Sequence, residues 1–110
     1  MTEPVSLMLA AEAPEMPNLQ GSGRVLVRGQ RAIQPLMFIG GPREFDNGYI
    51  VHSGDEFIHV IAGRVQFELN GEGIYDLSPG DSLHYGSGIK HRWRQLGSRE
   101  SRFLAVLTGR

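Results

Sequence analysis

The chain has 110 residues, which is enough for one domain with a modest hydrophobic core. Hydrophobic residues make up 40% of it and charged residues 21%, a balance that is typical of a globular protein and excludes a disordered chain. No apolar run approaches the roughly 20 residues of a membrane-spanning helix. The N-terminal residues lack the basic start of a secretory signal, so we expect a cytoplasmic protein with no membrane partner.

The charge balance and the absence of cysteine narrow the function further. A net charge of −1 argues against direct nucleic-acid binding, which needs clustered positive charge. The chain has no cysteine, so disulfides and thiolate metal sites are excluded. Any metal site therefore has to use imidazole and carboxylate ligands.

The first predicted unit is an N-terminal segment, residues 1–20, in which three prolines interrupt any long element. Its apolar stretch, residues 5–11, is open to three interpretations: a short helix, a strand that docks on a partner, or a loose tail. We expect the single folded domain to cover residues 21–110.

Short runs of β-branched and aromatic residues alternate with glycine and proline turns through this domain, which predicts an all-β sandwich or barrel. The predicted strands are 24–28, 34–39, 48–52, 56–61, 64–69, 73–77, 81–85, 90–95 and 101–108.

Two of these strands have informative patterns. Residues 64–69 alternate apolar and polar side chains, which indicates one buried and one solvated face, and Asn70-Gly71 predicts a tight hairpin after them. Residues 56–61 are apolar on both faces apart from Glu56 and His59. We therefore expect this strand to be covered on one side by the interior and on the other by a second sheet or subunit.

The residues that indicate chemistry are His52, Glu56 and His91. His52 and Glu56 flank the turn at 53–55, and a hairpin there would place them across from each other on adjacent strands. A carboxylate that faces an apolar interior needs compensation, by a metal ion, a hydrogen-bonding partner or a polar ligand. A barrel can return the strand that leads to His91 beside this hairpin.

Two imidazoles and one carboxylate would form a metal site with open coordination positions. That geometry suits Fe(II) and is compatible with Mn, Ni, Co or Zn. The alternative is that both histidines are ordinary polar residues at strand ends and that Glu56 caps the turn.

Several neighbours are candidates for lining the same pocket: Ile50, Tyr49, His84, Tyr85 and Trp93. Trp93 shares the face of His91, whereas Arg92 and Arg94 alternate away from it and are expected on the solvated outer face. His59 lies on the opposite face of its strand from Glu56, so we assign it to packing. The direction of His84 stays open, and a structural role is favoured for it.

The segments HSGDEFIHVIAG (52–63) and LSPGDSLHYGSGIKHRWR (77–94) resemble the two conserved motifs of the cupin family. The positions that match the motifs are His52, Glu56, Gly63, Gly80, Asp81, Gly88 and His91. There are departures: Ile50 stands where the first motif has another histidine, Gly86 replaces a proline, Glu44 replaces a glycine, and Arg94 or Gln95 lies near the usual asparagine. The resemblance covers about residues 34–108. It implies a double-stranded β-helix, the jelly-roll barrel, with a three-ligand site of His52, Glu56 and His91.

The spacing also resembles the C-terminal sensor half of bacterial regulators that join a helix-turn-helix to a cupin barrel. The three-ligand arrangement is similar to that of the iron-dependent hydroxypropylphosphonate epoxidase. These likenesses imply a ligand-binding sensor module that holds a divalent metal and a small molecule, and cupin barrels commonly form homodimers. The alternatives are a metal-dependent oxygenase, isomerase or epimerase, and a structural cupin with an empty barrel.

Overall fold

The computed structural model describes residues 4–16, 22–45 and 48–108. Within these ranges the chain forms antiparallel strands and one short 3-10 helix, Ala10–Glu12. The strands are β1 (Glu15–Met16), β2 (Ser22–Val25), β3 (Ile33–Ile39), β4 (Glu56–Ala62), β5 (Arg64–Leu69), β6 (Gly73–Leu77), β7 (Ser82–Tyr85), β8 (His91–Leu96) and β9 (Arg102–Thr108). The all-β fold is therefore confirmed. In the described part of the chain, no helix is long and apolar enough to cross a membrane.

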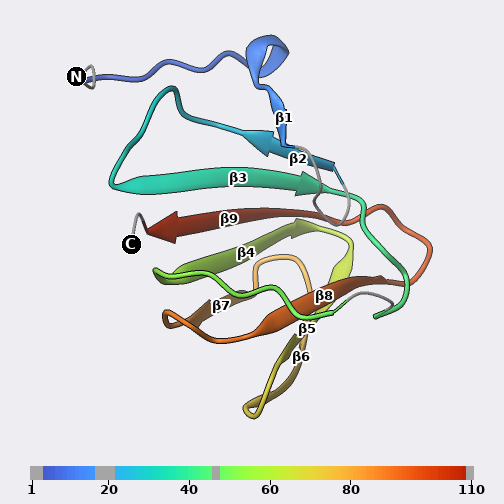
Figure 1. Ribbon diagram of the computed structural model, residues 1–110. Coiled ribbons are helices and arrows are strands. Elements are labelled where there is room, and N and C mark those ends of the chain that lie inside the picture. The colour runs from blue at the N-terminus through green and yellow to red at the C-terminus, as the bar shows by residue number, and fades with distance from the viewer. Residues whose placement is uncertain (1–3, 17–21, 46–47, 109–110) are drawn as a thin grey trace.

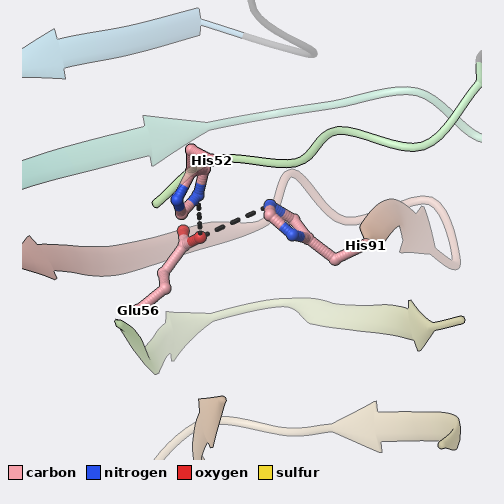
Figure 2. A group of neighbouring side chains, drawn as sticks. All are labelled: His52, Glu56 and His91. Carbon is pink, nitrogen blue, oxygen red and sulfur yellow. Dashed lines mark hydrogen bonds and ion pairs between the residues drawn. The ribbon is translucent and has the colours of Figure 1, made fainter. Parts of the chain in front are cut away.

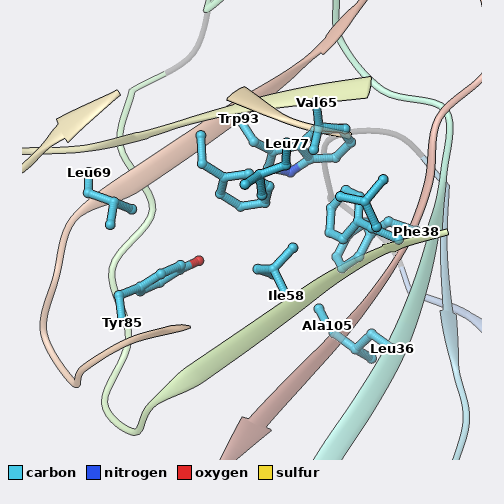
Figure 3. Packing of buried hydrophobic residues seen from close by; sticks show 12 residues of the cluster. Leu36, Phe38, Ile58, Val65, Leu69, Leu77, Tyr85, Trp93 and Ala105 are labelled. Atoms are coloured by element: carbon cyan, nitrogen blue, oxygen red, sulfur yellow. The ribbon is translucent and has the colours of Figure 1, made fainter. Parts of the chain in front are cut away.

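The strands form two sheets that enclose the core between them (Figure 1). One sheet has six strands in the order β1-β2-β3-β9-β4-β7, and the other has three in the order β6-β5-β8. Strands that are far apart in sequence are neighbours, because β9 lies between β3 and β4. The apolar side chains that fill the space between the sheets include Ile58, Val65, Phe67, Phe103 and Ala105, all at most 1% exposed (Figure 3).

Alternation along β5 accounts for the packing of the smaller sheet. Val65, Phe67 and Leu69 are buried, whereas the polar residues between them face outward, as their pattern predicted. The predicted hairpin at Asn70-Gly71 is confirmed: β5 pairs with β6, and Gly71 has a φ of +83°. A residue with no Cβ adopts this left-handed conformation without strain.

The predicted strand at 48–52 is wrong. In its place the structure has a single bridge between Ile50 and His91, in which each backbone N–H donates to the other residue's carbonyl, at 2.7 and 2.9 Å. Both edges of β4 are already taken, one by β7 and the other by β9. Residues 48–52 therefore have no free edge beside β4 and run along the start of β8. The strand predicted at 24–28 also lies earlier, at Ser22–Val25.

Among the described residues no second sheet covers the outer face of β4, and cover by a second subunit, the other possibility for 56–61, stays a prediction. Phe57 is 39% exposed and Ile61 47% exposed, so no element among the described residues covers this face. In the N-terminal segment, residues 5–9 form neither a helix nor a strand, and the 3-10 helix covers Ala10–Glu12. The guanidinium of Arg28 contacts this segment at the carbonyl of Leu7, 2.9 Å away, and at the carboxylate of Glu12, 2.7 Å away.

Candidate metal centre

His52, Glu56 and His91 converge inside the barrel from three different places in the chain (Figure 2). His52 lies in the loop between β3 and β4, while Glu56 and His91 are the first residues of β4 and β8. The Nε2 atoms of His52 and His91 lie 3.0 and 3.4 Å from Oε1 of Glu56. All three potential ligand atoms lie within 4.8 Å of one another, which is the spacing of groups that can share one metal ion.

The route by which His52 reaches Glu56 is not the hairpin that the sequence suggested. Residue 50 bridges to β8 of the smaller sheet, whereas Glu56 belongs to the larger sheet. The turn at 53–55 therefore crosses between the two sheets. Gly54 in this turn has a φ of +89°, and a Cβ there would lie 2.6 Å from the carbonyl oxygen of Thr108. The close approach of the turn to β9 fixes the path of the chain between the two ligands.

Backbone carbonyls set the orientation of both imidazoles. Nδ1 of His91 lies 2.9 Å from the carbonyl oxygen of Ile89, and Nδ1 of His52 lies 3.2 Å from that of Ser53. A carbonyl can only accept a hydrogen bond, so Nδ1 carries the hydrogen in each ring. In the neutral rings the lone pairs of both Nε2 atoms then point at the same carboxylate oxygen. This arrangement needs a positive charge between the groups, and a metal ion supplies one.

Burial strengthens this requirement at two of the three ligands. Glu56 is 7% exposed and His91 4% exposed. Burial lowers the pKa of His91, which favours the neutral form that binds metals. The hydroxyl of Tyr85 donates a hydrogen bond of 2.8 Å to Oε1 of Glu56, and burial, with the charge of Glu56, raises the pKa of Tyr85. Tyr85 therefore stays protonated as a donor to the carboxylate.

These residues fit a divalent ion by the chemistry of their donors. Two imidazole nitrogens and one carboxylate oxygen form the set that binds non-haem Fe(II) with open positions, and Mn, Ni and Zn accept the same donors. With neutral histidines and an ionised glutamate, the bound site would carry a net charge of +1.

The three ligands line a cavity of about 120 Å³. The residues that line it are Met16, Leu36, Phe38, Ile50, His52, Glu56, Phe67, His91, Trp93, Phe103 and Leu107. Apart from the three ligands, these side chains are apolar.

The five neighbours predicted to line the pocket divide into three groups. Ile50 and Trp93 line the cavity. Tyr85 is buried behind the ligands and contacts the site through Glu56. Tyr49 and His84 lie elsewhere: Arg92 lies over the ring of Tyr49 at 4.7 Å, and exposed His84 lies 3.1 Å from Asp55. His84 sits on the outer face of β7 because its neighbour Tyr85 faces inward.

Three phenylalanines of the cavity were missed as site residues, namely Phe38, Phe67 and Phe103. The available signal was alternation: Phe67 and Phe103 lie on the inward faces of β5 and β9. Sequence alone does not reveal which inward residues border an empty space and which pack tightly.

The sequence also matches the model of a known protein family. The model of the family described as "Cupin domain" matches residues 37–107, more than half of the chain. This chain belongs to the cupin-domain family. A comparison with curated protein sequences finds no match.

Solved structures share the cupin fold with this chain. Hydroxypropylphosphonic acid epoxidase from S. wedmorenis is 21% identical, with a TM-score of 0.81 over 94% of this chain and 59% of that one. KdgF from Halomonas sp. is 20% identical, with a TM-score of 0.73 over 96% of this chain and 95% of that one. A cupin-like protein from Thermotoga maritima is 17% identical, with a TM-score of 0.64 over 80% and 69% of the two chains. At these identities the likeness shows the fold alone.

Proposed function

We propose that this cupin binds a divalent metal ion through His52, Glu56 and His91 and uses it to hold a small molecule in the barrel. One observation carries the proposal: two imidazoles, each fixed by a backbone carbonyl at Nδ1, aim Nε2 at one buried carboxylate oxygen. A proton on each ring would also relieve the contact. Burial opposes that solution at His91, because it lowers the pKa of the ring.

The role that the geometry supports best is reversible ligand binding, as in a sensor module. A metal with three protein ligands keeps open positions that a small molecule can occupy. Among the described residues that line the cavity, no acidic or basic group is present beyond the three ligands. A binding module needs no such group, whereas acid–base catalysis does.

A metal-dependent enzyme is the second candidate, favoured by the same open donor set. A bound metal would supply Lewis acidity or, with iron, redox chemistry, neither of which requires a separate protein base. The hydroxypropylphosphonic acid epoxidase that shares this fold has been solved with Fe(II). This chain spans 62% of the length of that protein.

We also propose that the protein is a homodimer that pairs through the outer face of the larger sheet. Phe57 and Ile61 of β4 are exposed there, beside half-buried Leu104 and Val106 of β9. Contiguous apolar side chains on a sheet face mark interaction sites more often than single ones do.

Metal content tests the metal site directly. The variant His52→Ala/His91→Ala should lose the metal that the natively purified chain retains, as measured by elemental analysis. The matched control is His59→Ala/His84→Ala, which removes the same number of imidazoles from positions outside the cavity, beside Ser82 and Asp55. It should keep the metal. Equal metal content in the two double variants would contradict the assignment.

The change in Tm on removal of the metal is a second measure of metal binding. Binding to the folded state alone stabilises it by about 2.7 kcal/mol when the free metal is at about 100 times its Kd. Removing the metal with a chelator should therefore lower the Tm of the natural chain by roughly 10 °C. The Tm of the His52→Ala/His91→Ala variant should not respond to the chelator.

A further inference from the structure

The proposed function does not specify the chemical class of the ligand. The residues that line the cavity limit which classes can bind. The floor of the cavity is a cluster of aromatic rings. Phe38 and Phe103 stack at 5.0 Å between centroids, Trp93 meets Phe103 edge-on at 4.8 Å, and Phe67 stacks on Trp93 at 6.2 Å. Such contacts hold each ring in place and present a rigid apolar surface.

The backbone at Gly41 also holds the indole ring of Trp93 in position. A Cβ built on Gly41 would lie 2.2 Å from the indole ring, so the backbone packs directly against it. The floor therefore cannot recede to admit a large molecule. The cavity of about 120 Å³ compares with about 150 Å³ for an apolar protein cavity that binds benzene. The available space suits a body the size of one ring or a short branched chain.

The cations near the site face away from this space. Arg92 and Arg94 flank Trp93 on β8 but belong to the opposite face of the strand. Their guanidinium groups contact Glu68 at 2.7 Å and Gln66 at 2.9 Å, and both lie over the ring of Phe45. No lysine or arginine occurs among the described residues that line the cavity.

The net charge of the metal with its three protein ligands determines which charge the metal-binding group of the ligand should carry. A divalent ion with two neutral imidazoles and one carboxylate leaves a net charge of +1. A monoanionic head neutralises it. A dianion such as a phosphonate would leave an unpaired negative charge among apolar side chains, and a sugar would leave its hydroxyl groups without hydrogen-bond partners.

We propose that the ligand of this site is a monoanionic chelator with a small apolar body, such as a hydroxamate, a singly ionised catechol or an enolised dicarbonyl that carries one ring. This inference rests on the proposed metal site. The head occupies the open positions beside His52, Glu56 and His91, and the body lies on the aromatic floor.

Hydroxamates of different size test both halves of this inference on the full-length chain loaded with Co²⁺. Calorimetry and the visible spectrum of the cobalt would report the binding of benzohydroxamate, acetohydroxamate and methylphosphonate. Benzohydroxamate should bind at least roughly tenfold more tightly than acetohydroxamate, because its ring leaves water. Methylphosphonate should not compete.

A pair of isoleucine variants locates the effect in the cavity. Ile50→Ala should reduce the advantage of benzohydroxamate over acetohydroxamate by roughly threefold, because Ile50 borders the cavity. Ile74→Ala on β6, where the side chain is 58% exposed, should leave that ratio unchanged. If Ile50→Ala also left it unchanged, the ring would not occupy this cavity and the inference would fail.

The outcomes separate this inference from the proposed function. Cobalt that binds at the site without discriminating between the two hydroxamates, or that binds methylphosphonate as tightly, would overturn the ligand class and leave the metal site standing. A chain that binds no cobalt would overturn both.

Discussion

At the scale of single residues, one carboxylate oxygen organises the site. Oε1 of Glu56 faces two imidazoles and accepts the hydroxyl hydrogen of Tyr85. This hydrogen bond fixes the orientation of the carboxylate, and the phenol ring also packs against the ring of His91, at 4.8 Å between centroids. Tyr85 is therefore a positioning residue in this site.

Removing that hydroxyl should weaken metal binding. We expect Tyr85→Phe to lower the affinity for Zn²⁺ by roughly tenfold, the lower end of the range for groups that orient metal ligands. Competition with a coloured chelator measures it. Tyr75→Phe is the control, since that side chain is 37% exposed and lies on β6, in the other sheet from Glu56. Equal affinities in the two variants would show that the tyrosine does not position the carboxylate.

At the scale of elements, the turn between His52 and Glu56 joins the two sheets. Gly54 occupies a left-handed conformation and packs against Thr108 of β9. Its N–H also donates to Oγ of Ser87 at 2.9 Å, so the turn contacts the loop that precedes β8. The ligands stay close together because this short crossing has little freedom.

A methyl group on Gly54 should disturb this crossing. We expect Gly54→Ala to destabilise the fold by about 2 to 4 kcal/mol, from the positive φ and the clash together. Gly71→Ala is the matched control, because Gly71 also has a positive φ, of +83°, but nothing within 4 Å of the added Cβ. Urea denaturation should show a smaller loss for Gly71→Ala, and equal losses would mean that the contact with Thr108 is unimportant.

Across β5 and β8, Glu68 and Arg92 make the stability depend on pH. The hydrogen bond from Arg92 holds the pKa of Glu68 below its usual value of 4.5. The unfolded chain therefore takes up a proton first as the pH falls. The stability that the pair contributes is present above about pH 4.5 and is lost below it.

We expect Glu68→Gln to flatten this dependence. Between pH 6 and about 3.5, the denaturation midpoint in urea should fall less for Glu68→Gln than for the natural chain. Glu72→Gln, at an exposed position in the β5–β6 turn, should follow the natural chain. A Glu68→Gln curve parallel to that of the natural chain would contradict this role.

At the scale of the whole molecule, substitutions on the outer face of the larger sheet test whether the protein is a dimer. Phe57→Ser/Ile61→Ser should convert the proposed dimer to a monomer, as measured by size-exclusion chromatography with light scattering. Ile74→Ser, on β6 of the other sheet, should leave the dimer intact. A natural chain that elutes as a monomer of 12.2 kDa would contradict the dimer.

The sequence alone was sufficient to predict the all-β class, most strands, the Asn70-Gly71 hairpin and the ligand candidates. These features depend on local patterns: alternation along a strand, residues that tolerate positive φ, and polar side chains among apolar ones. Residues 48–52 show where such patterns fail. Their composition suits a strand, but pairing also needs a free edge, and β7 and β9 occupy both edges of β4.

The way in which the site is assembled depends on the arrangement of the strands in space. His52 meets Glu56 across a turn between sheets, and Tyr85 joins them from β7, 29 residues after the glutamate. These contacts depend on the order of strands, which local patterns do not encode. The same holds for the cavity: alternation places Phe67 and Phe103 inside, but its size follows from how both sheets pack.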